Sequence, residues 1–211
     1  VGLEEGGTGA QAYADAVATY LAFAVDKAAD YWSSLCSWHS SRHIIRSTFG
    51  RQALPMVWDY AECSPFSEST GNWMACVDWV WKAVAAAPAG GYVSVRQVDA
   101  ATLAREGGVA IATAPPYYDN IGYADLSDYF YVWLRRMLGQ VHRSLFSTVL
   151  TPKSEELVAS AYRFGGDRAA ATRFFEEGLG KAFAKLREVQ HSGLPMTVYY
   201  AFKQAESEGD D

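Results

Sequence analysis

The residues best suited to chemistry stand together in the stretch TAPPYYDN (113–120). It follows the apolar run GGVAIAT (107–113), which is typical of a buried strand in a parallel sheet. Pro115 and Pro116 lack N–H groups, so they end the strand, fix φ and leave carbonyls free to accept hydrogen bonds. Tyr117 adds a flat aromatic face. Ligands of open parallel sheets bind beyond the carboxyl ends of strands. These groups suit a planar base that carries an amino group and is taken out of a duplex.

A motif this short also fits a plain Pro-Pro turn followed by core tyrosines. The wider block TAPPYYDNIGYADLSDYFYVWLRR (113–136) nevertheless resembles the Asp-Pro-Pro-Tyr region of amino-methylating DNA methyltransferases. The closest likeness is to the large bacterial and archaeal adenine-specific DNA methylases that carry a zinc-ribbon insertion. The likeness extends to FGRQALPMVWDYAE (49–62), LTPKSEELV (150–158) and VYYAFKQAE (198–206).

This resemblance implies a class I, Rossmann-like methyltransferase sheet. It also implies S-adenosylmethionine as the methyl donor and the exocyclic amine of adenine in DNA as the acceptor. In that family the first motif residue and the carbonyl of the first proline accept hydrogen bonds from the amine, and the aromatic ring stacks on the flipped base. Carried over, the acceptor position falls on Ala114, the carbonyl on Pro115 and the ring on Tyr117, with Pro116 between them.

Ala114 departs from the family pattern, which has Asp at this place. A methyl group cannot accept a hydrogen bond, and the amine has to be oriented toward the donor methyl. By analogy with lost oxyanion-hole donors, the missing acceptor removes ~3–4 kcal/mol of transition-state stabilisation. We therefore expect an impaired enzyme. The alternatives are a non-catalytic, degenerate methylase module that binds DNA or a partner chain, and an unrelated α/β interaction domain.

Further substrate contacts are expected from Tyr118, Asp119, Asn120 and Lys203. Asp119 and Asn120 serve equally well as braces of the turn that precedes a helix starting at Asp125.

Contact with S-adenosylmethionine is expected from Asp99 and Thr113, each at the end of an expected strand. Asp99 also fits an ordinary turn. The glycine-rich turn that holds the donor in this family is not found, because EGGTGAQ (5–11) and YRFGGDR (162–168) follow no strand. We therefore expect an inner or C-terminal portion of such a methylase. Its incomplete sheet would be completed by the remainder of the enzyme or by another chain.

The elements around the motif alternate between helices and strands. Helical periodicity runs over 11–35, 72–88, 125–139 and from 167 to 189, and strand-like runs cover 92–98, 107–113 and 196–203. Strands separated by helices indicate a mostly parallel α/β sheet, whereas 36–71 and 140–166 look irregular. We expect a flexible lead-in over 1–10, one incomplete domain over 11–205 with a helical part 11–88, and an acidic tail over 206–211.

Composition limits the partners. Half of the residues are hydrophobic and 14% are aromatic, which supports a packed core. The net charge of −6 gives no general attraction to nucleic acid. Contact with DNA would need a local patch, for which the candidates are Arg135, Arg136, Arg143, Lys153, Arg163, Arg168 and Lys203; a solvated helix end explains the first two equally well.

The remaining constellations favour ordinary roles. Cys36, His39 and His43 lack a second ligand pair, so we expect no metal. The aromatic run Tyr129, Phe130, Tyr131 and Trp133 reads as helical core. The apolar run from residue 16 to residue 25 is far short of the ~20 residues that a membrane span needs. Free thiols and the lack of a span indicate a cytoplasmic protein.

Overall fold

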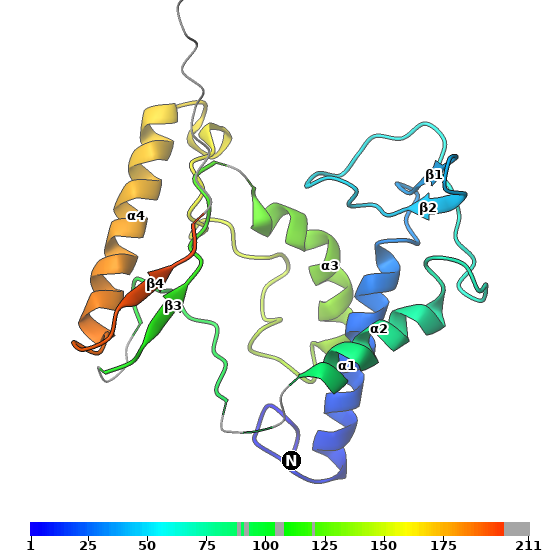
Figure 1. The fold of residues 1–211 in the computed structure, drawn as a ribbon, viewed down its shortest axis with the longest axis horizontal. Helices are drawn as coiled ribbons and strands as arrows, with labels where there is room; N and C mark the ends of the chain where they lie inside the picture. The colour runs from blue at the N-terminus through cyan, green and yellow to red at the C-terminus, as the bar shows by residue number, and fades with distance from the viewer. Residues whose placement is uncertain (88–89, 91–92, 104–107, 120, 201–211) are drawn as a thin grey trace, which may run out of the picture. The chain divides into compact units, whose positions relative to one another are not determined.

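The computed structural model describes residues 1–87, 90, 93–103, 108–119 and 121–200. In this part the protein is mixed α/β, with four α-helices and two small sheets (Figure 1). The chain divides into two compact units. Unit 1 comprises 1–93 and 123–153, and unit 2 comprises 94–122 and 154–211. That residues 11–205 form one domain stays a prediction.

Unit 1 is built on the helices α1 (Ala10–Ala29), α2 (Trp73–Ala86) and α3 (Tyr123–Leu138). Buried Ala24 and Ala28 of α1 meet buried Cys76 of α2, and half-buried apolar side chains of α2 close around them. The small alanine side chains allow the two helices to approach closely. Asn72 caps α2 as predicted, because its side chain accepts a hydrogen bond from the Ala75 N–H at 2.8 Å.

The aromatic run on α3 packs within unit 1. The Tyr129 hydroxyl donates to the Ala29 carbonyl of α1 at 2.8 Å, and the rings of Tyr129 and Phe130 each lie 5.2 Å from the Phe49 ring. Tyr131 is buried and donates to the Thr148 carbonyl at 2.9 Å. The prediction of a packing role is therefore confirmed for these three residues. Trp133 is an exception, being 45% exposed.

Two stretches of unit 1 differ from expectation. Residues 36–71 contain a short antiparallel hairpin, β1 (Ser37–His39) paired with β2 (Ile44–Arg46), where only irregular chain was predicted. The lead-in over 1–10, expected to be flexible, makes specific hydrogen bonds. The Leu3 N–H donates to the Asp15 carboxylate at 2.9 Å, and the Glu4 carboxylate accepts from the backbone N–H groups of residues 143 and 144.

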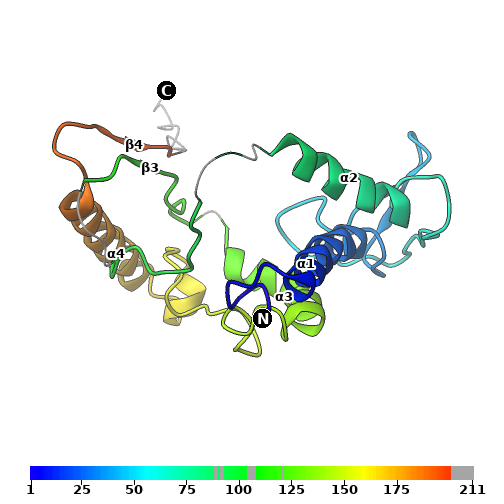
Figure 2. The same ribbon diagram turned by 90° about the horizontal axis from the view of Figure 1, so that it is seen from below.

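Unit 2 holds the parallel pair β3 (Ile111–Thr113) and β4 (Met196–Val198), with Ala112 opposite Thr197. The connection between them contains α4 (Arg168–Val189) and the short 3₁₀ helix η1 (Ala161–Phe164), and a helical crossover is what parallel strands require. Figure 1 and Figure 2 both show α4 alongside the two strands. Asp167 caps α4 as predicted, accepting from the Ala170 N–H at 3.0 Å.

The predicted strand over 92–98 is wrong for residues 93–98, which form no strand. Val93 and Val95 are 77% and 88% exposed. β-Branched residues favour strands because their side chains pack well on a half-buried pleated surface. Residues 93–98 pair with no described strand, so this packing is not available to them. The other two predicted strands are confirmed in part, since β3 and β4 each cover only a portion of the predicted run.

No α-helix in the described ranges combines the length and the apolar content needed to cross a membrane.

Candidate functional site

The candidate loop, residues 114–119 in unit 2, begins directly after the carboxyl end of β3. The last strand residue, Thr113, accepts a hydrogen bond at its carbonyl from the Tyr199 N–H at 2.8 Å. Ala114 and the two prolines then leave the ladder, and the prolines could not extend it because they lack N–H groups. The loop therefore stands at the end of a parallel strand where ligands of such sheets bind.

The proline carbonyls are available as acceptors. Pro115 and Pro116 are half-buried, and no described residue donates a hydrogen bond to either carbonyl. The side chain of Ala114 is exposed and carries no polar atom. The Pro115 carbonyl is thus an acceptor that a ligand could use on the loop beyond β3, whereas the Ala114 side chain offers none.

The two tyrosines of the loop have different surroundings. The ring of Tyr117 is half-buried and meets the Tyr200 ring edge to face, with centroids 5.6 Å apart and planes at 83°. Tyr118 is anchored to α4. Its hydroxyl lies 2.6 Å from the Thr172 hydroxyl, and its ring meets the Phe175 ring edge to face at 5.3 Å.

The backbone at Tyr118 is also fixed, because its carbonyl accepts from the Ala159 N–H at 2.7 Å. These contacts hold the loop against the segment before η1 and against α4. Tyr118 is therefore an anchor of the loop, and Tyr117 is the tyrosine whose hydroxyl is left without a described hydrogen-bond partner.

The other predicted ligand contacts are dispersed. Asp119 is exposed, and no described residue hydrogen-bonds to its carboxylate. Asn120 and Lys203 lie outside the described residues. Asp99 braces its own turn, accepting from the Ala101 N–H at 2.9 Å and, through its carbonyl, from the Thr102 N–H. No described contact brings Asp99 to the loop.

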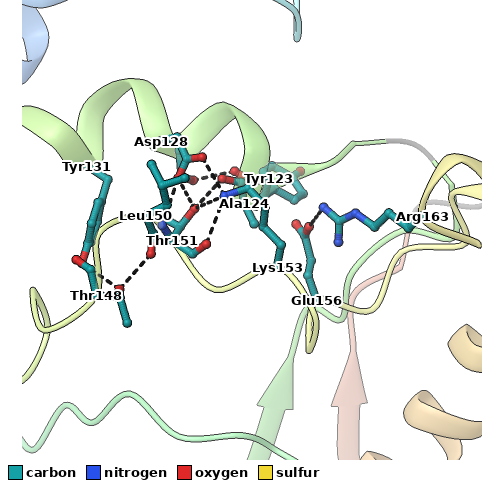
Figure 3. A network of polar contacts seen from close by, with 11 residues as sticks. Tyr123, Ala124, Asp128, Tyr131, Thr148, Leu150, Thr151, Lys153, Glu156 and Arg163 are labelled. Carbon is teal, nitrogen blue, oxygen red and sulfur yellow. Dashed lines mark hydrogen bonds and ion pairs between the residues drawn. The ribbon is translucent and has the colours of Figure 1, made fainter.

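Two candidates for the basic patch are taken up by carboxylates (Figure 3). In unit 1, Lys153 Nζ lies 2.6 Å from Asp128 Oδ2, and Asp128 Oδ1 accepts from the Thr151 N–H at 2.9 Å. Burial raises the pKa of Asp128, but the hydrogen bonds from Lys153 and Thr151 outweigh it and hold that pKa below its usual range. In unit 2, Arg163 pairs with Glu156 at 2.6 Å. The candidates that stay exposed are Arg135, Arg136, Arg143 and Arg168.

The ion pair of Asp128 is not predicted by the sequence. The stretch LTPKSEELV contains Thr151 and Lys153, but nothing in it indicates a contact with Asp128. These contacts fasten the segment after α3 onto the first turns of that helix, since the Thr151 hydroxyl also lies 2.6 Å from the Ala124 carbonyl.

The cysteine and histidine stretch makes ordinary contacts. Cys36 is buried and its thiol lies 3.4 Å from the Asp30 carbonyl, while His39 Nδ1 lies 3.1 Å from the Ser41 hydroxyl. Within the part of the chain that the structure describes, no three His, Cys, Asp or Glu side chains converge as metal ligands would.

Comparisons of the chain with protein-family models, with curated proteins and with solved structures found no match.

Proposed function

We propose that this chain is part of a DNA methyltransferase that acts on the exocyclic amine of adenine, with residues 114–119 as the base-recognition loop. The observation that supports the proposal is the position of the loop. Ala114, Pro115, Pro116 and Tyr117 follow the carboxyl end of a parallel strand, and the proline carbonyls accept no hydrogen bond from a described residue. The proposal includes a Rossmann-like sheet, of which β3 and β4 are two strands, and DNA as the partner.

The loop would act by orientation. The Pro115 carbonyl would accept one N–H of the amine, and the Tyr117 ring would stack on the flipped base. This reaction type needs no covalent intermediate with the protein, so the work of the chain would be to bind the base and to fix the orientation of its amine. Ala114 leaves the second N–H without an acceptor, which makes the chain a weak catalyst.

The methyl donor S-adenosylmethionine does not fit a described site on this chain. No described strand leads into a glycine-rich turn, because Gly165 and Gly166 follow η1 and the glycines before α1 follow no strand. The Asp99 carboxylate, a candidate for the adenosyl part, already accepts the Ala101 N–H.

The proposal is tested by restoring the acceptor. Ala114→Asp in the complete protein should raise transfer of tritiated methyl groups to DNA by about 10²–10³-fold, since one charge-assisted contact in the transition state contributes ~3–4 kcal/mol. Ala114→Asn, which restores an oxygen without the charge, is the matched control and should give a smaller gain. A folded Ala114→Asp variant that is no faster than the wild type would contradict the role given to this position.

Ala114 also favours a second candidate, a non-catalytic module that binds DNA or a partner chain. Calorimetry with S-adenosylmethionine separates the two. Saturable binding of the donor supports the enzyme, and its absence in the complete protein supports the module.

A further inference from the structure

A second polar and aromatic site lies in unit 1, at the first turns of α3. Its volume is about 390 Å³, within the range of small-molecule sites. One wall is the segment 49–52, and the other is formed by residues of α3. The lining residues are Phe49, Gly50, Arg51, Gln52, Tyr123, Leu126, Ser127 and Phe130.

The aromatic wall of this pocket is fixed before any ligand arrives. The Phe49 N–H donates to Asp30 Oδ1 at 3.0 Å, and the N–H of the preceding Thr48 donates to the Asp30 carbonyl at 2.7 Å. The Phe49 ring then rests against the Phe130 ring at 5.2 Å. On the opposite side, Ser127 donates its hydroxyl to the Tyr123 carbonyl at 2.6 Å, so its oxygen is held in place with lone pairs to spare.

The polar groups of the pocket are cationic or neutral. Arg51 is the only charged residue in the lining. Arg51 and Gln52 are both exposed, and neither side chain hydrogen-bonds or pairs with a described residue. The nearest acids in sequence on α3 are Asp125, exposed on the first turn, and Asp128, whose carboxylate is neutralised by Lys153.

The sequence around Arg51 adds to this positive character. Arg42, Arg46 and Arg51 all fall between Asp30 and Asp59, and no Asp or Glu lies between those two acids. The whole chain, in contrast, carries a net charge of −6. A cationic segment in an acidic protein indicates an anionic ligand at that place.

We propose that this pocket binds one nucleotide, with the base against the Phe49 and Tyr123 rings and the phosphate on the Arg51 guanidinium. Aromatic faces accept any base by stacking, and the planar guanidinium fork matches phosphate oxygens. The Gln52 amide and Ser127 hydroxyl can bond base edges or sugar. The site shares no residue with the loop at 114–119, and it does not require that loop to read adenine. The nucleotide is either free or one unit of a single strand.

Calorimetry with the full chain tests the proposal. The probes contain thymine, which lacks an exocyclic amine, so their binding does not depend on the adenine-recognition role proposed for the loop. The probes are thymidine monophosphate, an eight-residue oligothymidylate, thymidine and orthophosphate. Binding of the monophosphate identifies a free nucleotide as the ligand, and binding of the oligonucleotide alone identifies a strand. Either result supports the site if Arg51→Ala lowers the affinity for that probe tenfold or more, as the loss of a guanidinium–phosphate pair predicts.

Two variants sharpen the test. Arg46→Ala removes an exposed arginine of the same segment that does not line the pocket and whose side chain has no described partner. Arg46 adds only long-range attraction, which salt screens, so this change should alter the affinity less than twofold at about 0.15 M salt. Tyr123→Ala should weaken thymidine monophosphate several-fold while leaving orthophosphate unchanged. The proposal is overturned if the wild type binds neither nucleotide probe, if Arg46→Ala costs as much as Arg51→Ala, or if orthophosphate binds as tightly as the nucleotide.

Discussion

Asp26 gives unit 1 a dependence on pH whose sign follows from the structure. It lies on α1 four residues after buried Ala22 and three before Ala29, whose carbonyl binds α3 through Tyr129. Asp26 Oδ1 is buried, and no described residue hydrogen-bonds to it. Burial raises the pKa of Asp26 to about 7. Below about pH 7 the fold therefore holds this carboxyl in its neutral form, and the folded state loses stability when the carboxyl ionises.

The size of the effect follows from linkage. An unfolded Asp has a pKa of about 3.9, so the folded state binds the extra proton between about pH 4 and pH 7. The contribution of Asp26 to the free energy of unfolding is then highest below pH 4 and falls as the pH rises through this window. A difference of ~3 pKa units corresponds to an upper bound of ~4 kcal/mol, which partial exposure of the residue reduces. Asp26→Asn keeps the shape, cannot ionise, and should remove this slope.

Urea unfolding followed by tryptophan fluorescence measures the effect directly, because all seven tryptophans lie in unit 1. Relative to the wild type, Asp26→Asn should be more stable by a few kcal/mol at pH 8 and by no more than about 1 kcal/mol at pH 4.5. Asp59→Asn is the control, since Asp59 is exposed in the same unit. Equal gains of Asp26→Asn at both pH values, or no gain at pH 8, would refute the reasoning.

Three further changes probe the architecture. Asp167→Ala should cost unit 2 about 1 kcal/mol by loss of the α4 cap, and Asp167→Ser should restore most of it, as measured by urea unfolding followed by circular dichroism. Asp128→Ala should lower the free energy of unfolding of unit 1 by ~2 kcal/mol at pH 7. Because the pKa of Asp128 is lowered in the folded protein, this loss should shrink as the pH falls below about 4. A loss that stays constant with pH would contradict the role of the ionised carboxylate. A thiol reagent should modify the half-buried Cys63 before the buried Cys36 and Cys76. The reaction of Cys63 should still be slow, because burial raises the pKa of its thiol. Equal rates for all three thiols would be inconsistent with the fold.

Local signals predicted the four helices, although the first one ends at Ala29 and not at residue 35 as predicted. Asn72 and Asp167 were recognised as caps because a side-chain oxygen at a helix start satisfies N–H groups that have no other partner, and this depends on a few adjacent residues only. The parallel arrangement of β3 and β4 followed from the helical crossover between them. The place of the loop at the end of β3 was likewise a consequence of proline chemistry.

What the sequence could not provide depends on distant partners. Residues 93–98 have strand composition but no neighbouring strand, so propensity alone misled. Asp128 and Lys153 are 25 positions apart, and only the folded chain brings them to 2.6 Å. The pocket around Arg51 is formed by two segments more than seventy positions apart in the chain. No sequence pattern in either segment predicts that the two are in contact. The sequence does show that the stretch between Asp30 and Asp59 contains arginines and no acidic residue, which indicates a positively charged segment.

The central claim is that the loop at 114–119 holds the exocyclic amine of adenine on the Pro115 carbonyl. The direct measurement compares binding of two single-stranded oligonucleotides that differ only in one base, adenine or purine without the amine. The wild type should prefer adenine by about fivefold, as one neutral hydrogen bond of ~1 kcal/mol predicts. Ala114→Asp should widen the preference by a further factor of ten or more through a charge-assisted bond. Equal binding of the two oligonucleotides by both proteins would contradict the claim.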